Sequence, residues 1–137
     1  MGMANLIPND VVAIIREAQY RTDITLGDHS LIADEPTDQN GSNLGPTPYQ
    51  LLAASLAACT SITLRMYADR KKLPLTSVEV HVNLEKPAAD QTKFVRNIQL
   101  IGELKPEEKE RLLQVANACP IHKILSGKIE IQSALTE

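Results

Sequence analysis

The feature that most constrains this 137-residue chain is a stretch without charged residues from Thr47 to Leu64 that must form one long helix. Thr47 can cap the helix, and Pro48 suits the first helical position because its missing N–H costs nothing there. Gln50 completes a capping box with Thr47. The pattern ends before Pro74, because a proline biases the residue before it away from the helical conformation. We therefore expect a helix of about 24 residues, roughly 36 Å long.

A helix that is apolar on every side must be buried on every side, in a membrane or in a protein core. The apolar run is near the length of a membrane span. However, serines and threonines interrupt it, and the charged segment 65–72 continues the same helical pattern. We therefore interpret it as a central core helix. Because one domain of this size has few other elements to cover a helix of roughly 36 Å, we expect a second copy of the chain to cover the rest, in a symmetric homodimer.

The remaining segments alternate between strand and helix patterns. Gly27-Asp28 has glycine first, which favours a type II′ hairpin turn between two of the strands. Strands are expected at 11–15, 19–26, 29–33, 77–84, 92–104 and 128–133, and shorter helices at 106–119 and 120–125. A long loop, 34–46, leads into the central helix. The order predicts an α+β fold with antiparallel sheets in a single domain, residues 1–137.

Charge and cysteine content exclude several classes of protein. A net charge of −3 and a pI near 5.6 argue against nucleic-acid binding. The N-terminus lacks a basic region followed by an apolar run, so no signal peptide is expected. The two cysteines stand sixty positions apart and fit no disulfide scaffold. We therefore expect a protein of the reducing cytoplasm, with no membrane partner.

Cys59 lies near the middle of the long helix and has two interpretations. It is either a small buried hydrophobic side chain or a nucleophilic thiolate. A mid-helix position gains nothing from the helix dipole. The reactive interpretation therefore needs a nearby cation, for which Arg21 and Arg65 are candidates.

Cys119 stands immediately before Pro120, a residue that suits the first position of a helix. Cys119 would then be an N-cap, where backbone N–H groups and the helix dipole favour a thiolate. His122 could relay a proton to it. The alternative is a loop cysteine without a function. Cys119 and His122 also match half of a zinc site, but no second pair stands nearby in the sequence, so we expect no metal.

The segment GPTPYQLLAASLAACTSITLRMYADRKKLPL, with ADEP upstream and ANACPIHKIL downstream, resembles the OsmC/Ohr family of thiol-dependent hydroperoxide reductases. It is most similar to a less studied branch of that family, whose helix carries an RMYA-x-RK tail. The resemblance covers nearly the whole chain. It implies an OsmC-like fold, in which sheets from both chains of an intertwined homodimer wrap two long helices, with sites at the subunit interface.

The resemblance also implies an activity, the reduction of organic hydroperoxides and, more weakly, of hydrogen peroxide in oxidative-stress defence. By position, Cys59 corresponds to the peroxidatic cysteine, which becomes a sulfenic acid, and Cys119 to the resolving cysteine, which forms a disulfide with it. A small dithiol or another thiol reductant then restores both thiols. No cofactor is implied.

The start of the long helix differs from that of the best-studied family members. In those proteins a glutamate follows the proline and pairs with an activating arginine from the first hairpin turn. Here Tyr49 follows Pro48, and the turn is Gly27-Asp28. An alternative function is therefore a redox-sensing or small-molecule-binding protein of the same fold, without efficient turnover. The candidates for activating or lining the site are Arg21, Tyr49, Gln50 and His122.

Overall fold

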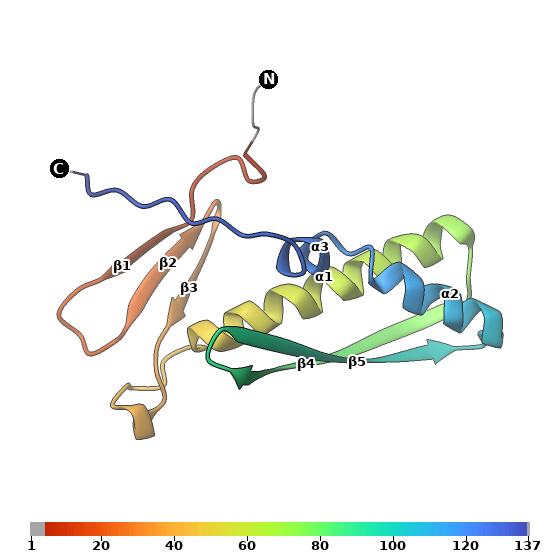
Figure 1. The fold of residues 1–137 in the computed structure, drawn as a ribbon, viewed down its shortest axis with the longest axis horizontal. Coiled ribbons are helices and arrows are strands. Elements are labelled where there is room, and N and C mark those ends of the chain that lie inside the picture. The colour runs from red at the N-terminus through yellow and green to blue at the C-terminus, as the bar shows by residue number, and fades with distance from the viewer. Residues whose placement is uncertain (1–4, 137) are drawn as a thin grey trace. The chain divides into compact units, whose positions relative to one another are not determined.

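The computed structural model describes residues 5–136, and the chain divides into two compact units, residues 1–51 and 52–137. The antiparallel strands and separate helices confirm the predicted α+β class. In chain order the elements are β1 (Val12–Ile15), β2 (Thr22–Leu26), β3 (His29–Ala33), the 3₁₀ turn η1 (Thr37–Gln39), α1 (Pro48–Lys71), β4 (Leu75–Ala88), β5 (Gln91–Gly102), α2 (Pro106–Ala116) and α3 (Pro120–Leu125) (Figure 1).

The first unit contains a three-stranded antiparallel meander in the order β1-β2-β3. Leu26 pairs with His29 across the two-residue turn, which confirms the predicted hairpin. Gly27 has a φ of 62°, and the first central position of a type II′ turn requires a positive φ, which glycine adopts without a steric penalty.

The long loop before α1 is organised by the buried carboxylate of Asp34. Its oxygens accept hydrogen bonds from the backbone N–H groups of Glu35 (2.7 Å), Ser42 (3.5 Å) and Leu44 (3.1 Å). Burial by itself raises the pKa of this carboxyl, but the three hydrogen bonds and the positive charge of Arg21 hold the pKa below its usual value. The loop is therefore an ordered connection that sets the start of α1.

Both ends of α1 follow the local sequence signals. The backbone N–H of Thr47 donates to Gln50 Oε1 (2.9 Å) and the backbone N–H of Gln50 donates to Thr47 Oγ1 (3.1 Å), which is the predicted capping box. After the last helical residue, Lys72 turns into the left-handed region with a φ of 57°. The N–H of Leu73 then donates to the carbonyl of Ala68 at 2.8 Å and closes the helix.

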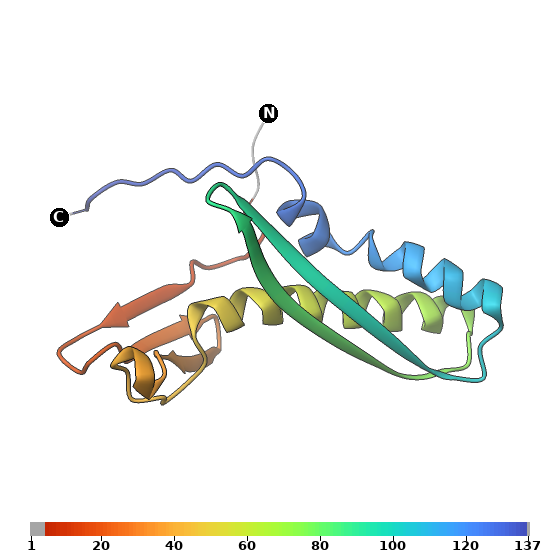
Figure 2. The ribbon, with the colours of Figure 1, turned by 60° about the horizontal axis from the view of Figure 1, so that its bottom comes forward.

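In the second unit, β4 and β5 form a two-stranded antiparallel ribbon that runs along α1, with α2 beside the end of α1 that leads into β4 (Figures 1 and 2). The ribbon is longer than predicted, because only Ala89 and Asp90 form its turn. A core forms where the ribbon, α1 and α2 meet. It contains buried Leu64, Leu112, Val115 and Ala116, surrounded by Tyr67, Leu73, Val78, Ile98, Leu100 and Leu104.

The strand predicted at 128–133 is wrong, because the described residues 128–136 form no strand. Apolar and polar residues alternate in this segment, which is the pattern of a strand. Alternation does not, however, specify a neighbouring strand with which the backbone could pair. The apolar side chains of this segment remain exposed, and Ile131 is 87% exposed.

The hydrogen bonds to the buried Asp34 carboxylate predict a pH-dependent contribution to stability. A carboxyl whose folded-state pKa is lowered stabilises the fold above its unfolded-state pKa, and this contribution is lost as the pH falls through the folded-state pKa. Asp34→Asn is therefore expected to lower the urea midpoint at neutral pH, with a difference from wild type that shrinks in acid. Urea unfolding followed by circular dichroism across the acid range measures this. Asp38→Asn in η1 removes the same charge as a control, and equal midpoints for wild type and Asp34→Asn at every pH would contradict the account.

Candidate functional site: a pair of contacting thiols

The structure brings the two cysteines of the chain together as free thiols. Cys59 lies near the middle of α1 and is partly exposed, whereas Cys119, immediately before α3, is 0% exposed. The S–H of Cys59 donates a hydrogen bond to the sulfur of Cys119. Two sulfurs in hydrogen-bond contact, with only one of them open to solvent, form an asymmetric pair.

Cys119 is the N-cap of α3, as the sequence predicted. Pro120 occupies the first helical position, and the backbone N–H of His122 donates to Cys119 Sγ at 3.5 Å. The N–H of Ile121 is a second donor to this sulfur. The sulfur therefore takes the place that an aspartate or serine oxygen usually takes at a helix start.

The surroundings of Cys119 favour its thiolate. Burial by itself raises the pKa of Cys119, but the hydrogen bond from Cys59, the N–H groups of His122 and Ile121, and the hydroxyl of Thr60 lower the pKa below that of an ordinary thiol. These are the donors that a sulfur anion needs in a site from which water is largely excluded.

The surroundings of Cys59 favour its thiol. Burial raises the pKa of Cys59, as do the hydrogen bond that it donates to Cys119 and the charge on Cys119. The N–H of Ile121 and the hydroxyl of Thr63 oppose these effects without reversing them. Because the two groups titrate as a pair, the first negative charge resides mainly on Cys119, and Cys59 keeps the shared proton.

Arg96 on β5 is a site residue that the sequence analysis missed. Its Nη1 donates to the hydroxyl of Thr60 (3.0 Å) and to the carbonyl of Ala116 (3.4 Å), and its Nη2 donates to Asn117 Oδ1 (3.0 Å). The signal was present in the alternation of the predicted strand. Arg96 occupies a position in register with Phe94 and Ile98, which belong to the apolar face of β5.

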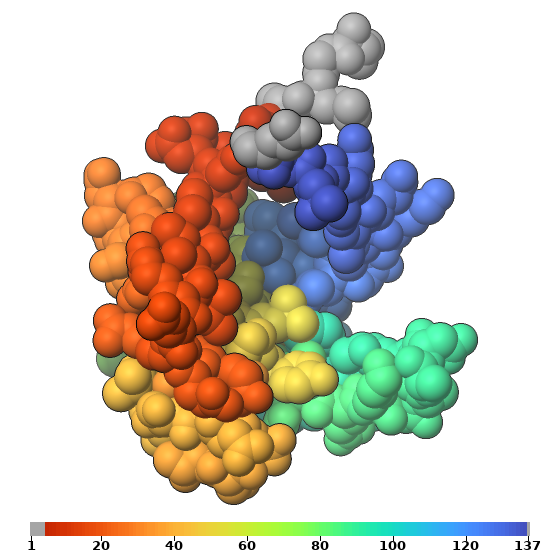
Figure 3. Space-filling view, turned by 90° about the vertical axis from the view of Figure 1, so that its left-hand side faces the viewer, coloured from red at the N-terminus to blue at the C-terminus, as the bar shows by residue number. Residues whose placement is uncertain are grey.

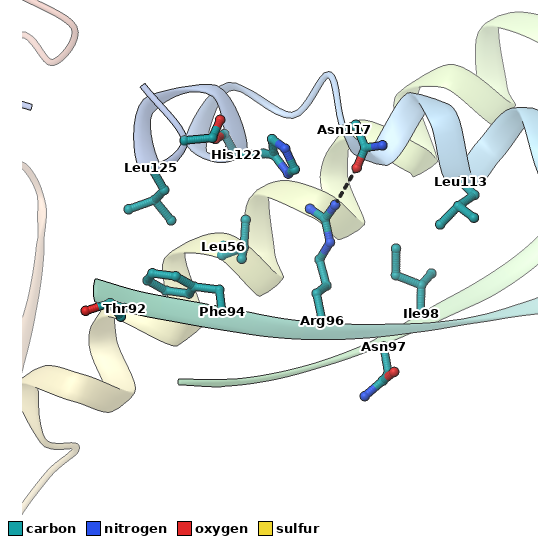
Figure 4. A pocket seen from close by; sticks show the side chains of 11 residues that line it. Leu56, Thr92, Phe94, Arg96, Asn97, Ile98, Leu113, Asn117, His122 and Leu125 are labelled. Atoms are coloured by element: carbon teal, nitrogen blue, oxygen red, sulfur yellow. Dashed lines mark hydrogen bonds between the residues drawn. The ribbon is translucent and has the colours of Figure 1, made fainter. Parts of the chain in front are cut away.

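Arg96 also lines a cavity of about 660 Å³ between β5 and the helices. Figure 4 shows the side chains of Arg96, Asn117 and His122 turned toward one another at its centre. In the space-filling view the tip of the β4–β5 ribbon, in green, stands apart from the blue segment that contains α3 (Figure 3). The apolar part of the lining comes from Leu56, Phe94, Ile98, Leu113 and Leu125, and Thr92, Asn97 and Ser126 add polar groups.

The other predicted candidates have different surroundings. Arg21 is exposed and its Nη2 lies 3.3 Å from Asp23, while Tyr49 is exposed. Gln50 serves in the capping box. These three residues belong to the first unit. Arg65 pairs with Asp69 at 2.8 Å and donates to the carbonyl of Leu75. The structure thus brings together Cys59, Cys119 and His122 from the sequence-predicted set.

The chain belongs to the OsmC-like protein family, because the family model described as OsmC-like protein matches residues 40–134. This confirms the resemblance found in the sequence. It also identifies α1, which is long and apolar enough for a membrane span, as the core helix of an OsmC-like domain.

Known relatives extend the comparison. The organic hydroperoxide resistance protein OhrB of Bacillus subtilis is 28% identical over 105 residues, which are 73% of this chain and 76% of that protein. Its crystal structure has a TM-score of 0.64 at 26% identity, over 90% of this chain and 93% of that one. An OsmC-like protein of Mycoplasma pneumoniae has a TM-score of 0.72 at 21% identity, over 86% of each chain.

A structure from Vibrio cholerae adds a bound ligand to the comparison. It is described as an organic hydroperoxide resistance protein with captopril bound in one of its active sites. It has a TM-score of 0.63 at 21% identity and covers 96% of this chain and 93% of that one. At this identity the likeness establishes the fold.

The asymmetry of the thiol pair predicts opposite shifts in two variants. Cys119→Ala is expected to lower the pKa of Cys59, because both the acceptor and the charge that raise this pKa are removed. Cys59→Ala is expected to raise the pKa of Cys119, because a donor to its thiolate is removed. The ultraviolet absorbance of the thiolate, followed against pH, measures both. Shifts of the same sign in the two variants would be incompatible with this assignment.

Proposed function

We propose that this protein is a thiol-dependent peroxidase of the cytoplasm that reduces organic hydroperoxides, and more weakly hydrogen peroxide, in oxidative-stress defence, and that the whole chain is one OsmC-like domain. The observation that carries the proposal is the contact between a partly exposed thiol and a buried thiol at a helix N-cap. The family membership and the name of the B. subtilis relative support the substrate class.

The difference in exposure supports a division of roles within the pair. Within one chain Cys59 is partly exposed whereas Cys119 is 0% exposed, so Cys59 is the more accessible of the two sulfurs. Cys59 is therefore the peroxidatic cysteine and Cys119 the resolving cysteine. His122, whose N–H supports the Cys119 sulfur, lines the adjoining cavity.

The proposed oxidation begins with proton transfer from the Cys59 thiol to the Cys119 thiolate along their hydrogen bond. The Cys59 thiolate attacks the distal oxygen of the hydroperoxide, and the O–O bond breaks. The products are a Cys59 sulfenic acid and an alkoxide, which takes the proton from Cys119 and leaves as an alcohol. The restored Cys119 thiolate then attacks the sulfenic sulfur. An S–S bond forms, and hydroxide leaves and is protonated to water.

A small dithiol or another thiol reductant completes the cycle by thiol–disulfide exchange, in which its own thiols are oxidised as both cysteines are reduced. These steps use the two sulfurs and the one proton that the pair holds, and the second proton, which converts hydroxide to water, comes from solvent. The proposed chemistry therefore calls for no metal and no bound cofactor.

A second candidate function is ligand binding or redox sensing without efficient turnover. The cavity of about 660 Å³, which His122 lines but neither cysteine does, favours it, and the V. cholerae relative holds a small ligand in an active site. Steady peroxide consumption with excess dithiol distinguishes the candidates. A peroxidase turns over many times, whereas a sensor is oxidised once.

Replacing each cysteine with serine tests the proposed roles. Cys59→Ser is expected to abolish peroxide consumption, because a serine hydroxyl is not ionised at neutral pH and is a weak nucleophile without a base. Cys119→Ser is expected to retain the first oxidation and to accumulate the sulfenic acid, which a dimedone adduct reports by mass. Peroxide consumption is followed with cumene hydroperoxide and dithiothreitol. Activity surviving in Cys59→Ser would overturn the assignment of the nucleophile.

We further propose that the protein is an intertwined homodimer with the thiol pair at the subunit interface. Leu52, Cys59 and Met66 follow one another at intervals of seven residues, which is about two helical turns, and Ile62 is three residues after Cys59. The four side chains therefore share one face of α1. Ile62 and Met66 are 54% and 64% exposed, and only 22% of an apolar stretch of 18 residues in α1 is buried within the chain. A second copy would cover this apolar face, and the unpaired segment 128–136 is available for strand pairing.

The dimer proposal predicts a mass of two chains by light scattering at micromolar concentration. Ile62→Asp is expected to shift the protein toward the monomer, because it places a charge in the covered face. Leu6→Asp, at an exposed leucine outside α1, adds the same charge as a control. A wild-type mass of one chain would refute the proposal.

A further inference from the structure

Arg96 is a cation without an anionic partner in the described part of the chain. It lies on the same face of β5 as Phe94, Ile98 and Leu100, which line the cavity or pack on the core. A charge on such a face is costly unless other groups compensate it. Its three hydrogen-bond acceptors are a hydroxyl, a backbone carbonyl and a side-chain amide, all of them neutral. No carboxylate of residues 5–136 forms an ion pair with it.

One hydroxyl connects Arg96 to the thiol pair. Thr60 is fully buried, and its oxygen accepts from Arg96. The single proton of this hydroxyl is donated either to the carbonyl of Leu56, at 2.7 Å, or to the sulfur of Cys119. An anionic sulfur competes for this proton, and a hydroxyl that accepts from a guanidinium is a stronger donor.

Arg96 also holds the segment that carries Cys119. Its bonds to the Ala116 carbonyl and to Asn117 are made at the C-terminal end of α2, where a cation is favoured by the helix dipole. The N–H of Cys119 donates to the same Ala116 carbonyl at 3.3 Å. The guanidinium therefore ties β5 to the residues that set the position of the Cys119 sulfur.

We propose that Arg96 is the positioning residue of the thiol pair: through Thr60 and the end of α2 it supplies the positive charge that stabilises the anion on Cys119 and holds this sulfur against Cys59. The inference rests on the proposed function, because the Cys119 thiolate is the base and the resolving nucleophile of that mechanism. The positive charge of the site then comes from β5, whereas the sequence suggested Arg21 or Arg65 as its source.

The charged and titratable groups around Cys119 come from three elements. They are Cys59 on α1, His122 on α3 and Arg96 on β5, and only Arg96 carries a permanent charge. A test by titration must therefore separate Arg96 from His122, whose side chain lines the same cavity. The Arg96 variants are accordingly also measured in a His122→Asn background.

The test compares Arg96→Gln, Arg96→Lys and Thr60→Val with wild type. We expect Arg96→Gln to shift the first thiolate titration to higher pH and to slow the formation of the disulfide from the Cys59 sulfenic acid by about ten-fold at neutral pH, because less of Cys119 is the attacking thiolate when one charge-assisted hydrogen bond is lost. Arg96→Lys should restore part of this loss. Thr60→Val, which removes the connecting hydroxyl, should shift the titration in the same direction. Lys93→Gln is the matched control, because it removes an exposed positive charge from the same strand.

The pH profile separates stabilisation of the anion from a general structural role. Above both thiol titrations, Cys119 is ionised with or without Arg96, so the rates of disulfide formation in wild type and Arg96→Gln should converge. A ten-fold defect that persists at every pH, or a titration that Arg96→Gln leaves unmoved, would overturn the proposal. Circular dichroism and thermal unfolding check that each variant is folded. If wild type consumes no peroxide, the proposed function fails, while the thiolate titration still decides the role of Arg96.

Discussion

The site depends on the hydrogen bond from Cys59 to Cys119. Burial disfavours ionisation of both sulfurs, but the pKa of Cys119 is lowered by the donors around it, whereas the pKa of Cys59 is raised further by the bond that it donates and by the charge on Cys119. When the pair loses its first proton, the negative charge therefore lies mainly on Cys119 and the remaining proton on Cys59. In the proposed mechanism, Cys119 is the proton acceptor and resolving group and Cys59 is the nucleophile.

The second unit is arranged so that this contact forms. The helix α1 carries Cys59 and Thr60 at adjacent positions, and the α2–α3 connection carries Cys119 back to them across more than fifty residues of sequence. Leu64, Leu112 and Ala116 fix α1 against α2 in the core. The ribbon of β4 and β5 contributes Arg96, which binds both helices and so links the packing of the unit to the electrostatics of the thiols.

Local signals in the sequence determined what could be predicted. The capping box at Thr47 and Gln50, the turn at Gly27 and the N-cap at Cys119 are each set by a few neighbouring residues, and the structure has all three. Contacts between segments that are distant in the sequence could not be predicted from neighbouring residues in this way. The role of Arg96 depends on which helices face β5, and the strand expected at 128–133 depends on a partner that alternation does not specify.

The most direct test of the central claim is the product formed when reduced protein meets one equivalent of cumene hydroperoxide. Peptide mapping by mass spectrometry under non-reducing conditions identifies the bond that forms. The account predicts one disulfide within each chain, between Cys59 and Cys119, with both thiols lost together. Oxidation that stops at Cys59 while Cys119 stays a free thiol, or a disulfide that joins two chains, would contradict it.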